Sequence, residues 1–215
     1  MFTAAGKCAS SFPSNFTYTN YATTTTSSIT IPADAKIGDI AFLFDTPVNS
    51  TSTAPSNVVP SGWTQIYTGF GGTVDASRQT VSYKILQSGD AGSSITGMTG
   101  ESFRKAMLVF TPDQPINSVN FSTPSIEITD GNPAQQSLSM AGNTAPLLGF
   151  AVYRCSNNPV SPRTSSLTMN EIEVITAFYI KYIIYNFGDT PQDGTVDMND
   201  NGGTNGLSSF FAVFK

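Results

Sequence analysis

The sequence contains no histidine among its 215 residues. Histidine is the usual base near neutral pH and a common ligand of catalytic zinc, so His-based triads and most catalytic zinc sites are excluded. No Gly-x-Ser-x-Gly elbow or glycine-rich phosphate loop is present either. An enzyme would have to rely on carboxylates. A glycosidase needs two of them about 5–10 Å apart, such as Asp75 with Glu101 or Glu127 with Glu173. We interpret these acids as solvated loop and strand-end residues, and we predict no catalytic activity and no cofactor.

Charged residues are also scarce, at 12% of the chain, against about 25% in an ordinary globular domain. The net charge is −5, and the ten Lys and Arg residues are spread along the chain, so we expect no nucleic-acid partner. The densest basic pair, Arg104 and Lys105, is predicted to begin a strand and to end in water. Ser and Thr supply about a quarter of the residues. Such a composition favours short strands and turns over solvent-facing helices.

Long apolar runs are missing, since no segment approaches the roughly 20 residues of a membrane helix. Residues 1–8 lack the basic start and apolar core of a signal peptide. We therefore expect no membrane insertion and a cytoplasmic location. The two cysteines, Cys8 and Cys155, lie far apart in no ligand spacing. We expect two unpaired thiols, with a long-range disulfide as the alternative.

Short strand candidates recur, separated by clusters of Gly, Pro, Asn and Asp, as in a sandwich or barrel. We predict an all-β fold, an antiparallel β-sandwich with jelly-roll-like connections that fills residues 1–215 as one domain. Its core should hold Trp63 and the runs at 40–44, 81–86, 147–153 and 211–214. The predicted strands are 28–31, 40–44, 64–68, 80–86, 94–98, 106–110, 117–122, 125–129, 136–140, 147–153, 175–185, 195–198 and 208–214.

The chain also has features of an internal repeat. The strands that end in Gly-Asp at Asp90 and at Asp189 are alike, and Met-Leu-Val-Phe at 107–110 resembles Phe-Ala-Val-Phe at 211–214. One interpretation is two duplicated halves, about 1–112 and 113–215, forming facing sheets or successive sandwiches. The other interpretation is that there is no repeat, because any two strand–turn–strand segments look alike.

The order of five segments is the most informative pattern. Residues 31–45 form a turn followed by a strand that suits burial on both faces, and Pro-Ser-Gly-Trp at 60–63 is a turn before the only Trp. Residues 81–92 form a strand closed by Ser-Gly-Asp, with weaker matches at 147–153 and 181–189. In this order the segments resemble an all-β domain found in structural and tail-associated proteins of tailed bacteriophages. The similarity covers most of the chain, and its motifs are structural.

The resemblance implies a non-enzymatic structural protein of the virion, assembled in the host cytoplasm and displayed on the particle exterior. Its place would be a head decoration, a tail-tip knob or a fibre unit, acting in assembly, stabilisation or host attachment. Expected partners are other virion proteins and further copies of the chain in a closed homo-oligomer, most simply a trimer. The alternative is a carbohydrate-binding adhesin or receptor-binding module that contacts a host surface glycan.

One motif resembles a metal site. The segment from Asp197 to Gly202 matches the opening of a calcium loop, in which Asp197, Asn199 and Asn201 would be ligands. However, Ser208 stands where the bidentate Glu belongs, and Asn, Asp and Gly also gather in hairpin turns. We interpret the segment as a hairpin loop and predict no metal, with calcium as the alternative.

Four aromatic residues lie in the Ser/Thr/Asn-rich N-terminal stretch: Phe12, Phe16, Tyr18 and Tyr21. Rings beside amides can form a sugar-binding face, because pyranose C–H groups stack on aromatic rings. We favour the alternative, that these rings cover the edge of the sandwich or contact a neighbouring subunit.

Overall fold

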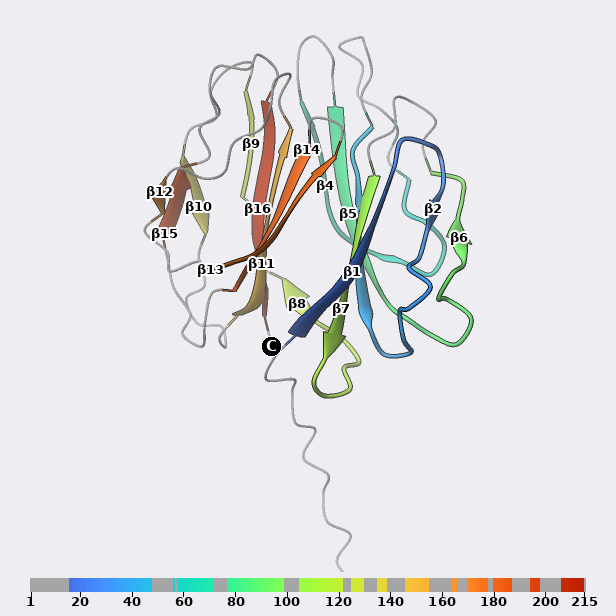
Figure 1. Ribbon diagram of the computed structural model, residues 1–215. Helices are drawn as coiled ribbons and strands as arrows, with labels where there is room; N and C mark the ends of the chain where they lie inside the picture. Colours follow the sequence, from blue (N-terminus) through green and yellow to red (C-terminus); the bar gives the residue numbers. More distant parts are fainter. Residues whose placement is uncertain are drawn as a thin grey trace, which may run out of the picture.

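The computed structural model describes thirteen segments of the chain, and every regular element in them is a β-strand (Figure 1). Within this part of the chain, no helix is long and apolar enough to cross a membrane. The described residues are 16–47, 56, 58–71, 77–98, 105–121, 125–129, 135–138, 146–154, 164–165, 170–177, 180–186, 194–197 and 206–214.

Two antiparallel sheets lie face to face and confirm the predicted β-sandwich (Figure 1). The first has the order β1-β7-β3-β5-β4, with bounds β1 (Phe16–Thr24), β7 (Lys105–Pro112), β3 (Ile40–Asp45), β5 (Ser77–Ile85) and β4 (Thr64–Gly71). The second has the order β13-β14-β11-β16, with bounds β13 (Asn170–Ala177), β14 (Ile180–Asn186), β11 (Pro146–Arg154) and β16 (Gly206–Phe214). The outer side of β16 pairs with β8 (Asn120–Phe121) and with β9 (Ser125–Thr129).

The two large sheets share one strand order. Taken in chain order, the strands of the first sheet are β1, β3, β4, β5 and β7, and those of the second are β9, β11, β13, β14 and β16. In both sheets the fifth strand lies between the first and the second, and the fourth lies between the second and the third. The segments that suggested a repeat therefore occupy equivalent strands, and the duplication of the halves stays a prediction. Among these strands the chain crosses between the two sheets only after β7, so the jelly-roll-like connections are not confirmed.

Aromatic rings fill the space between the sheets. Phe42 and Phe44 of β3 and Phe110 of β7 point inward from the first sheet and meet Phe150 of β11, with ring centroids 4.8, 5.8 and 5.8 Å from the Phe150 ring. On the second sheet, Phe211 of β16 stacks beside Phe150 at 5.2 Å. Because alternate residues of a strand face opposite sides, a single run such as 40–44 supplies Ile40, Phe42 and Phe44 to this core.

The other face of the first sheet carries a second core. Ala41 and Leu43 of β3 and Met107 and Val109 of β7 point outward and are covered by Ile31 and other residues of two loops. These loops pair through β2 (Ile29–Thr30) and β6 (Ser94–Ile95). The first sheet is thus buried on both faces, as the unbroken apolar run at 40–44 predicted.

Three short strands form a separate sheet beside the second one (Figure 1). They are β10 (Gln135–Leu138), β15 (Gly194–Asp197) and β12 (Thr164–Ser165). The sequence predicted β10 and β15 to within a few residues, but it missed β12.

Three other expectations need correction. The N-terminal stretch 16–24 was not predicted as a strand, yet β1 pairs along β7. The single strand predicted at 175–185 is a hairpin, because β13 ends at Ala177 and β14 begins at Ile180. Lys105 was expected in water, but it is buried beside Asp45 on the outer face of the first sheet.

Gly69 in β4 leaves room for the ring of Tyr67, which lies two residues earlier on the same face. A Cβ atom at position 69 would overlap the Tyr67 hydroxyl group. Burial raises the pKa of Tyr67 to about 12, with the positive charge of Arg78 acting in the opposite direction. The phenol therefore lies in a poorly hydrated position that depends on a glycine.

Gly69→Ala should therefore lower the free energy of unfolding by about 1–3 kcal/mol, because Tyr67 must leave its site. In a Tyr67→Ala background, the same change at Gly69 should cost much less. Urea unfolding of the four proteins measures the coupling. Equal costs of Gly69→Ala in both backgrounds would contradict this role of Tyr67.

Candidate functional site

A pocket of about 260 Å³ lies beside the second core and brings together residues from four segments. Pro60, Ser61 and Trp63 come from the turn before β4, and Lys84 comes from β5. Ile31, Asp90 and residues 93–96 complete the lining.

The turn at Pro60 sets the position of Trp63. The backbone N–H of Trp63 donates to the carbonyl of Pro60 at 3.1 Å, and Gly62 has φ of 79°, a conformation that favours glycine. The Trp63 side chain packs against the second core but is only half-buried. The predicted turn is therefore present, and Trp63 packs against the core as predicted but keeps part of its surface exposed.

The opposite wall of the pocket is an ion pair in a tight turn. Lys84 Nζ lies 2.7 Å from Asp90 Oδ1, and the backbone N–H of Gln87 donates to Asp90 Oδ2 at 2.7 Å. The pKa of the Asp90 carboxyl group lies below its ordinary value. Burial alone would raise this pKa, but the hydrogen bonds from Lys84 and Gln87 and the charge of Lys84 lower it by more. Asp90 therefore stays ionised and holds the Lys84 amine at the pocket wall.

These groups together can bind a polar ligand with an apolar face. The half-buried Trp63 ring offers apolar surface, while Lys84, Asp90 and the hydroxyl groups of Ser61, Ser93 and neighbouring residues offer donors and acceptors. Sugar rings present this combination of C–H faces and hydroxyl groups. Sequence reasoning noted Trp63 and Asp90 separately but did not place them in one site, because Trp63 precedes β4 and Asp90 lies in the turn after β5.

The lowered pKa of Asp90 gives a pH dependence. A carboxyl group with a depressed folded-state pKa adds stability that is present above its unfolded pKa of about 3.9, and this stability is lost as pH falls through the folded-state pKa. The difference in melting temperature between wild type and Asp90→Asn should thus shrink from neutral pH to about pH 2. Thermal unfolding followed by circular dichroism measures it. A difference that stays constant over this range would contradict the assignment.

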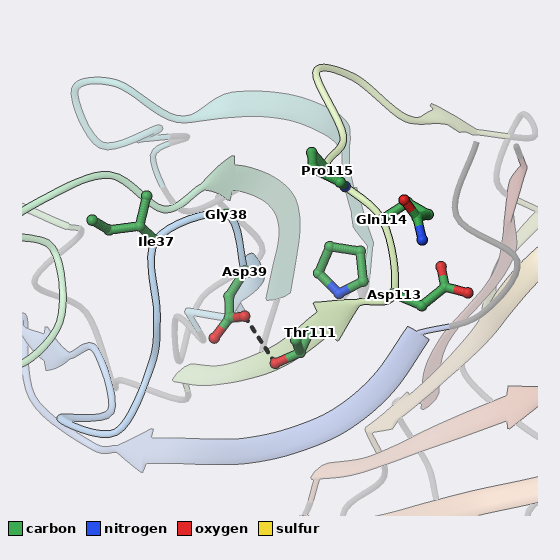
Figure 2. A pocket seen from close by; sticks show the side chains of 8 residues that line it. Ile37, Gly38, Asp39, Thr111, Asp113, Gln114 and Pro115 are labelled. Atoms are coloured by element: carbon green, nitrogen blue, oxygen red, sulfur yellow. Dashed lines mark hydrogen bonds between the residues drawn. The ribbon is translucent and has the colours of Figure 1, made fainter. Parts of the chain in front are cut away.

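A second pocket, of about 380 Å³, lies at the end of β7 and includes Asp39, Thr111 and Asp113 (Figure 2). The Asp39 carboxylate is buried and accepts hydrogen bonds from the Thr111 hydroxyl and the Lys36 backbone N–H, both at 2.8 Å. Figure 2 shows Asp113 pointing away from Asp39. Asp39 therefore fixes the loop before β3, and the pocket does not pair it with a second carboxylate.

The carboxylate pairs considered from the sequence do not form a described site. Glu127 lies in β9 and Glu173 in β13, at opposite edges of the second sheet. Four strand spacings separate them, which is about 19 Å along the sheet and outside the range for glycoside hydrolysis. Asp75 and Glu101 lie outside the described residues.

The candidate calcium loop is only partly described. Asp197 is the last residue of β15, whereas Asn199 and Asn201 lie outside the described residues. In the described part of the chain, no group of three or more Cys, Asp or Glu side chains could hold a metal ion. Cys8 and Cys155 also lie outside it. The hairpin interpretation and the state of the two thiols remain predictions.

Two of the N-terminal aromatic residues cover the edge of the sandwich. Phe16 is buried in the inter-sheet core, and the ring of Tyr18 meets Phe110 edge-on with centroids 5.6 Å apart. Tyr21 is 48% exposed, and Phe12 lies outside the described residues. Phe16 and Tyr18 therefore do not form an outward sugar-binding face.

Comparisons with models of protein families, with curated proteins and with solved structures gave no significant match.

Proposed function

We propose that this chain is a non-enzymatic structural protein of a tailed bacteriophage virion. It is assembled in the host cytoplasm and displayed on the particle exterior as a head decoration, a tail-tip knob or a fibre unit. The ordered motifs at 31–45, 60–66 and 81–92 support this proposal through their resemblance. The observation that carries it is the burial of the first sheet on both faces, which makes the domain a rigid block suited to a particle surface.

The sheet edges support association with further copies. Among the described residues, large apolar side chains are exposed on the edge strands at Tyr21 on β1 (48%) and Ile172 on β13 (40%). Edge strands are usually covered or paired in stable proteins. We propose that these edges meet in a closed homo-oligomer, most simply a trimer, which also contacts other virion proteins.

Light scattering during size-exclusion chromatography tests the oligomer. We expect a mass that is a small multiple of the chain mass, and a shift toward the single-chain mass in a Tyr21→Glu/Ile172→Glu variant. Ser61→Glu adds charge at the Trp63 pocket, away from these two residues, and serves as the control. A monomer for the unchanged protein at micromolar concentration would contradict this part of the proposal.

The second candidate function is glycan binding, favoured by the pocket around Trp63. Its ring, the Lys84–Asp90 ion pair and the surrounding hydroxyl groups supply the contacts that a surface polysaccharide needs. Binding of purified protein to host surface glycans, measured by calorimetry, tests this function. We expect Trp63→Ala to abolish binding and Ile37→Ala, at an exposed side chain outside this pocket, to leave it unchanged. Absence of any saturable binding, or equal binding by the Trp63→Ala variant, would eliminate this candidate.

A further inference from the structure

A row of polar residues crosses the outer face of the first sheet at one end. In register order the row is Thr24 on β1, Lys105 on β7, Asp45 on β3, Thr80 on β5 and Thr68 on β4. All five positions face the side that carries Leu43 and Met107. The row thus lies at the border of the apolar second core, and its centre is the pair Lys105 and Asp45.

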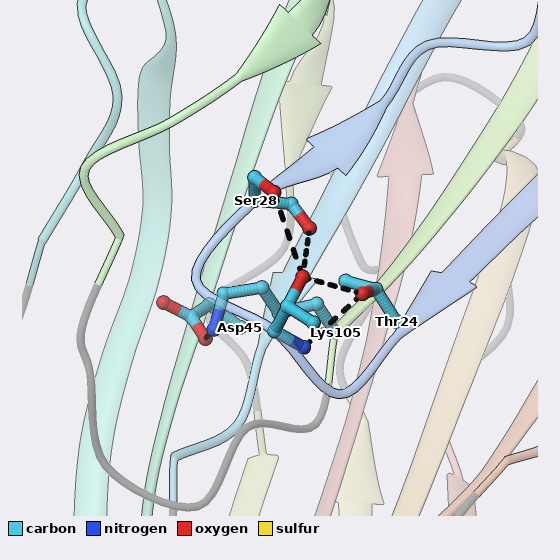
Figure 3. Close-up of polar contacts among 5 residues, drawn as sticks. Thr24, Ser28, Asp45 and Lys105 are labelled. Atoms are coloured by element: carbon cyan, nitrogen blue, oxygen red, sulfur yellow. Dashed lines mark hydrogen bonds and ion pairs between the residues drawn. The ribbon is translucent and has the colours of Figure 1, made fainter.

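The central pair is buried and in contact. Lys105 Nζ lies 3.0 Å from Asp45 Oδ1, and the two side chains are 0% and 4% exposed. Figure 3 shows the Lys105 amine directed at Asp45, next to the turn that holds Thr24 and Ser28. In that turn, the hydroxyl groups of Thr24 and Thr26 are 2.9 Å apart, and Thr26 donates to the Ser28 carbonyl at 3.0 Å.

The backbone holds this contact in place. Asp45 and Lys105 are direct partners in the antiparallel pairing of β3 with β7, and the register is continuous from Ile40 opposite Phe110 to this pair. Apolar residues on both faces of these strands fix the register. Fixed proximity raises the effective concentration of reacting groups, which reaches about 10⁵–10⁸ M where the two groups are well oriented.

We propose that Lys105 and Asp45 are joined by an amide bond between Nζ and Cγ. In the ion pair, one ammonium proton passes to the carboxylate, which gives an amine and a carboxylic acid. The Nζ lone pair attacks Cγ, the C–OH bond breaks, and the hydroxyl group leaves with a second proton of nitrogen as water. One ammonium and one carboxylate therefore yield one amide and one water, with no oxidant, reductant or other reactant.

Burial favours this product over the ion pair. Two charges removed from water carry a desolvation cost that their attraction offsets only in part, whereas a neutral amide carries no net charge. The same burial keeps bulk water, the reactant for hydrolysis, away from the bond. A covalent link between the two central strands β3 and β7 would make the first sheet resistant to being pulled apart, which suits a protein exposed on a particle.

The mass of the intact, denatured protein tests the cross-link. We expect the wild-type mass to be lower than the mass calculated from its sequence by one water molecule. Lys105→Arg keeps the cation but lacks the amine nucleophile, so it should have its full calculated mass. Asp45→Asn should lose one ammonia instead, because the amide nitrogen of Asn leaves. Both variants are prepared in the same way as the wild type, so removal of Met1 during expression would change all three masses by the same amount.

Peptide mapping places the missing water. After trypsin digestion, we expect a branched peptide in which the segments with Asp45 and with Lys105 are joined, and no cleavage after Lys105. A wild-type protein at its full calculated mass, with linear peptides on both sides of Lys105, would show an ion pair only and overturn the proposal. A water loss found within a linear peptide, such as a succinimide, would overturn it as well. The wild-type map alone decides the question if a variant fails to fold.

Discussion

Phe150→Ala is expected to lower the free energy of unfolding by about 3–5 kcal/mol, the cost of removing a large ring from a packed core. Phe150 is 1% exposed and meets Phe42, Phe44 and Phe110 across the sandwich and Phe211 beside it. The void would therefore open between the sheets, where backbone pairing cannot close it. Such a loss is a large fraction of the stability of an ordinary domain.

Urea unfolding followed by fluorescence and circular dichroism measures this effect. Phe150→Leu, which keeps most of the buried volume, should lose less than Phe150→Ala, and Ile37→Ala, at a side chain that is 71% exposed, should change little. A loss below about 1 kcal/mol for Phe150→Ala would mean that the two sheets do not pack through this ring.

Lys105→Met should cost a similar amount, about 3–5 kcal/mol, because it leaves the carboxyl group of Asp45 buried without its cation. The Lys105 side chain is fully buried and ends 3.0 Å from Asp45 Oδ1. The loss should appear whether the two residues form an ion pair or an amide, since both are broken by the change. Thermal and urea unfolding of the variant give the loss directly.

A double variant, Lys105→Met with Asp45→Leu, serves as the control. It removes the stranded carboxyl group and fills the site with apolar atoms, so it should recover part of the loss of the single variant. If Lys105→Met alone costs less than about 1 kcal/mol, the pair is accessible to water and its burial is wrong.

The central strands were predictable from the sequence because their residues obey one local rule. The run at 40–44 is apolar at every position, which is the pattern of a strand covered on both faces. The hairpin between β13 and β14 was missed because residues 175–185 carry β-branched and aromatic side chains with no Gly or Pro to mark a turn. Strand β1 was missed because its apolar alternation covers only Phe16 and Tyr18 and then breaks where the register with β7 shifts, between Tyr18 and Asn20.

The candidate site was less predictable, because it depends on contacts between distant segments. Lys105 looked like a solvated strand end, but it is buried in an ion pair with its cross-strand partner Asp45. Trp63 was expected in the core, but the loop strand β6 and the turn at Pro60 leave one side of its ring at the pocket. Pairing of charges and the covering of a sheet face by loops are tertiary effects, which the local pattern of residues does not encode.

The location of the protein in purified particles tests the central proposal most directly. Antibodies raised against the folded domain should label the outside of intact bacteriophage particles at one repeated position, and a density map should hold the two-sheet sandwich there. Absence of the protein from purified particles, or labelling only after the particles are broken open, would contradict a structural role on the virion exterior.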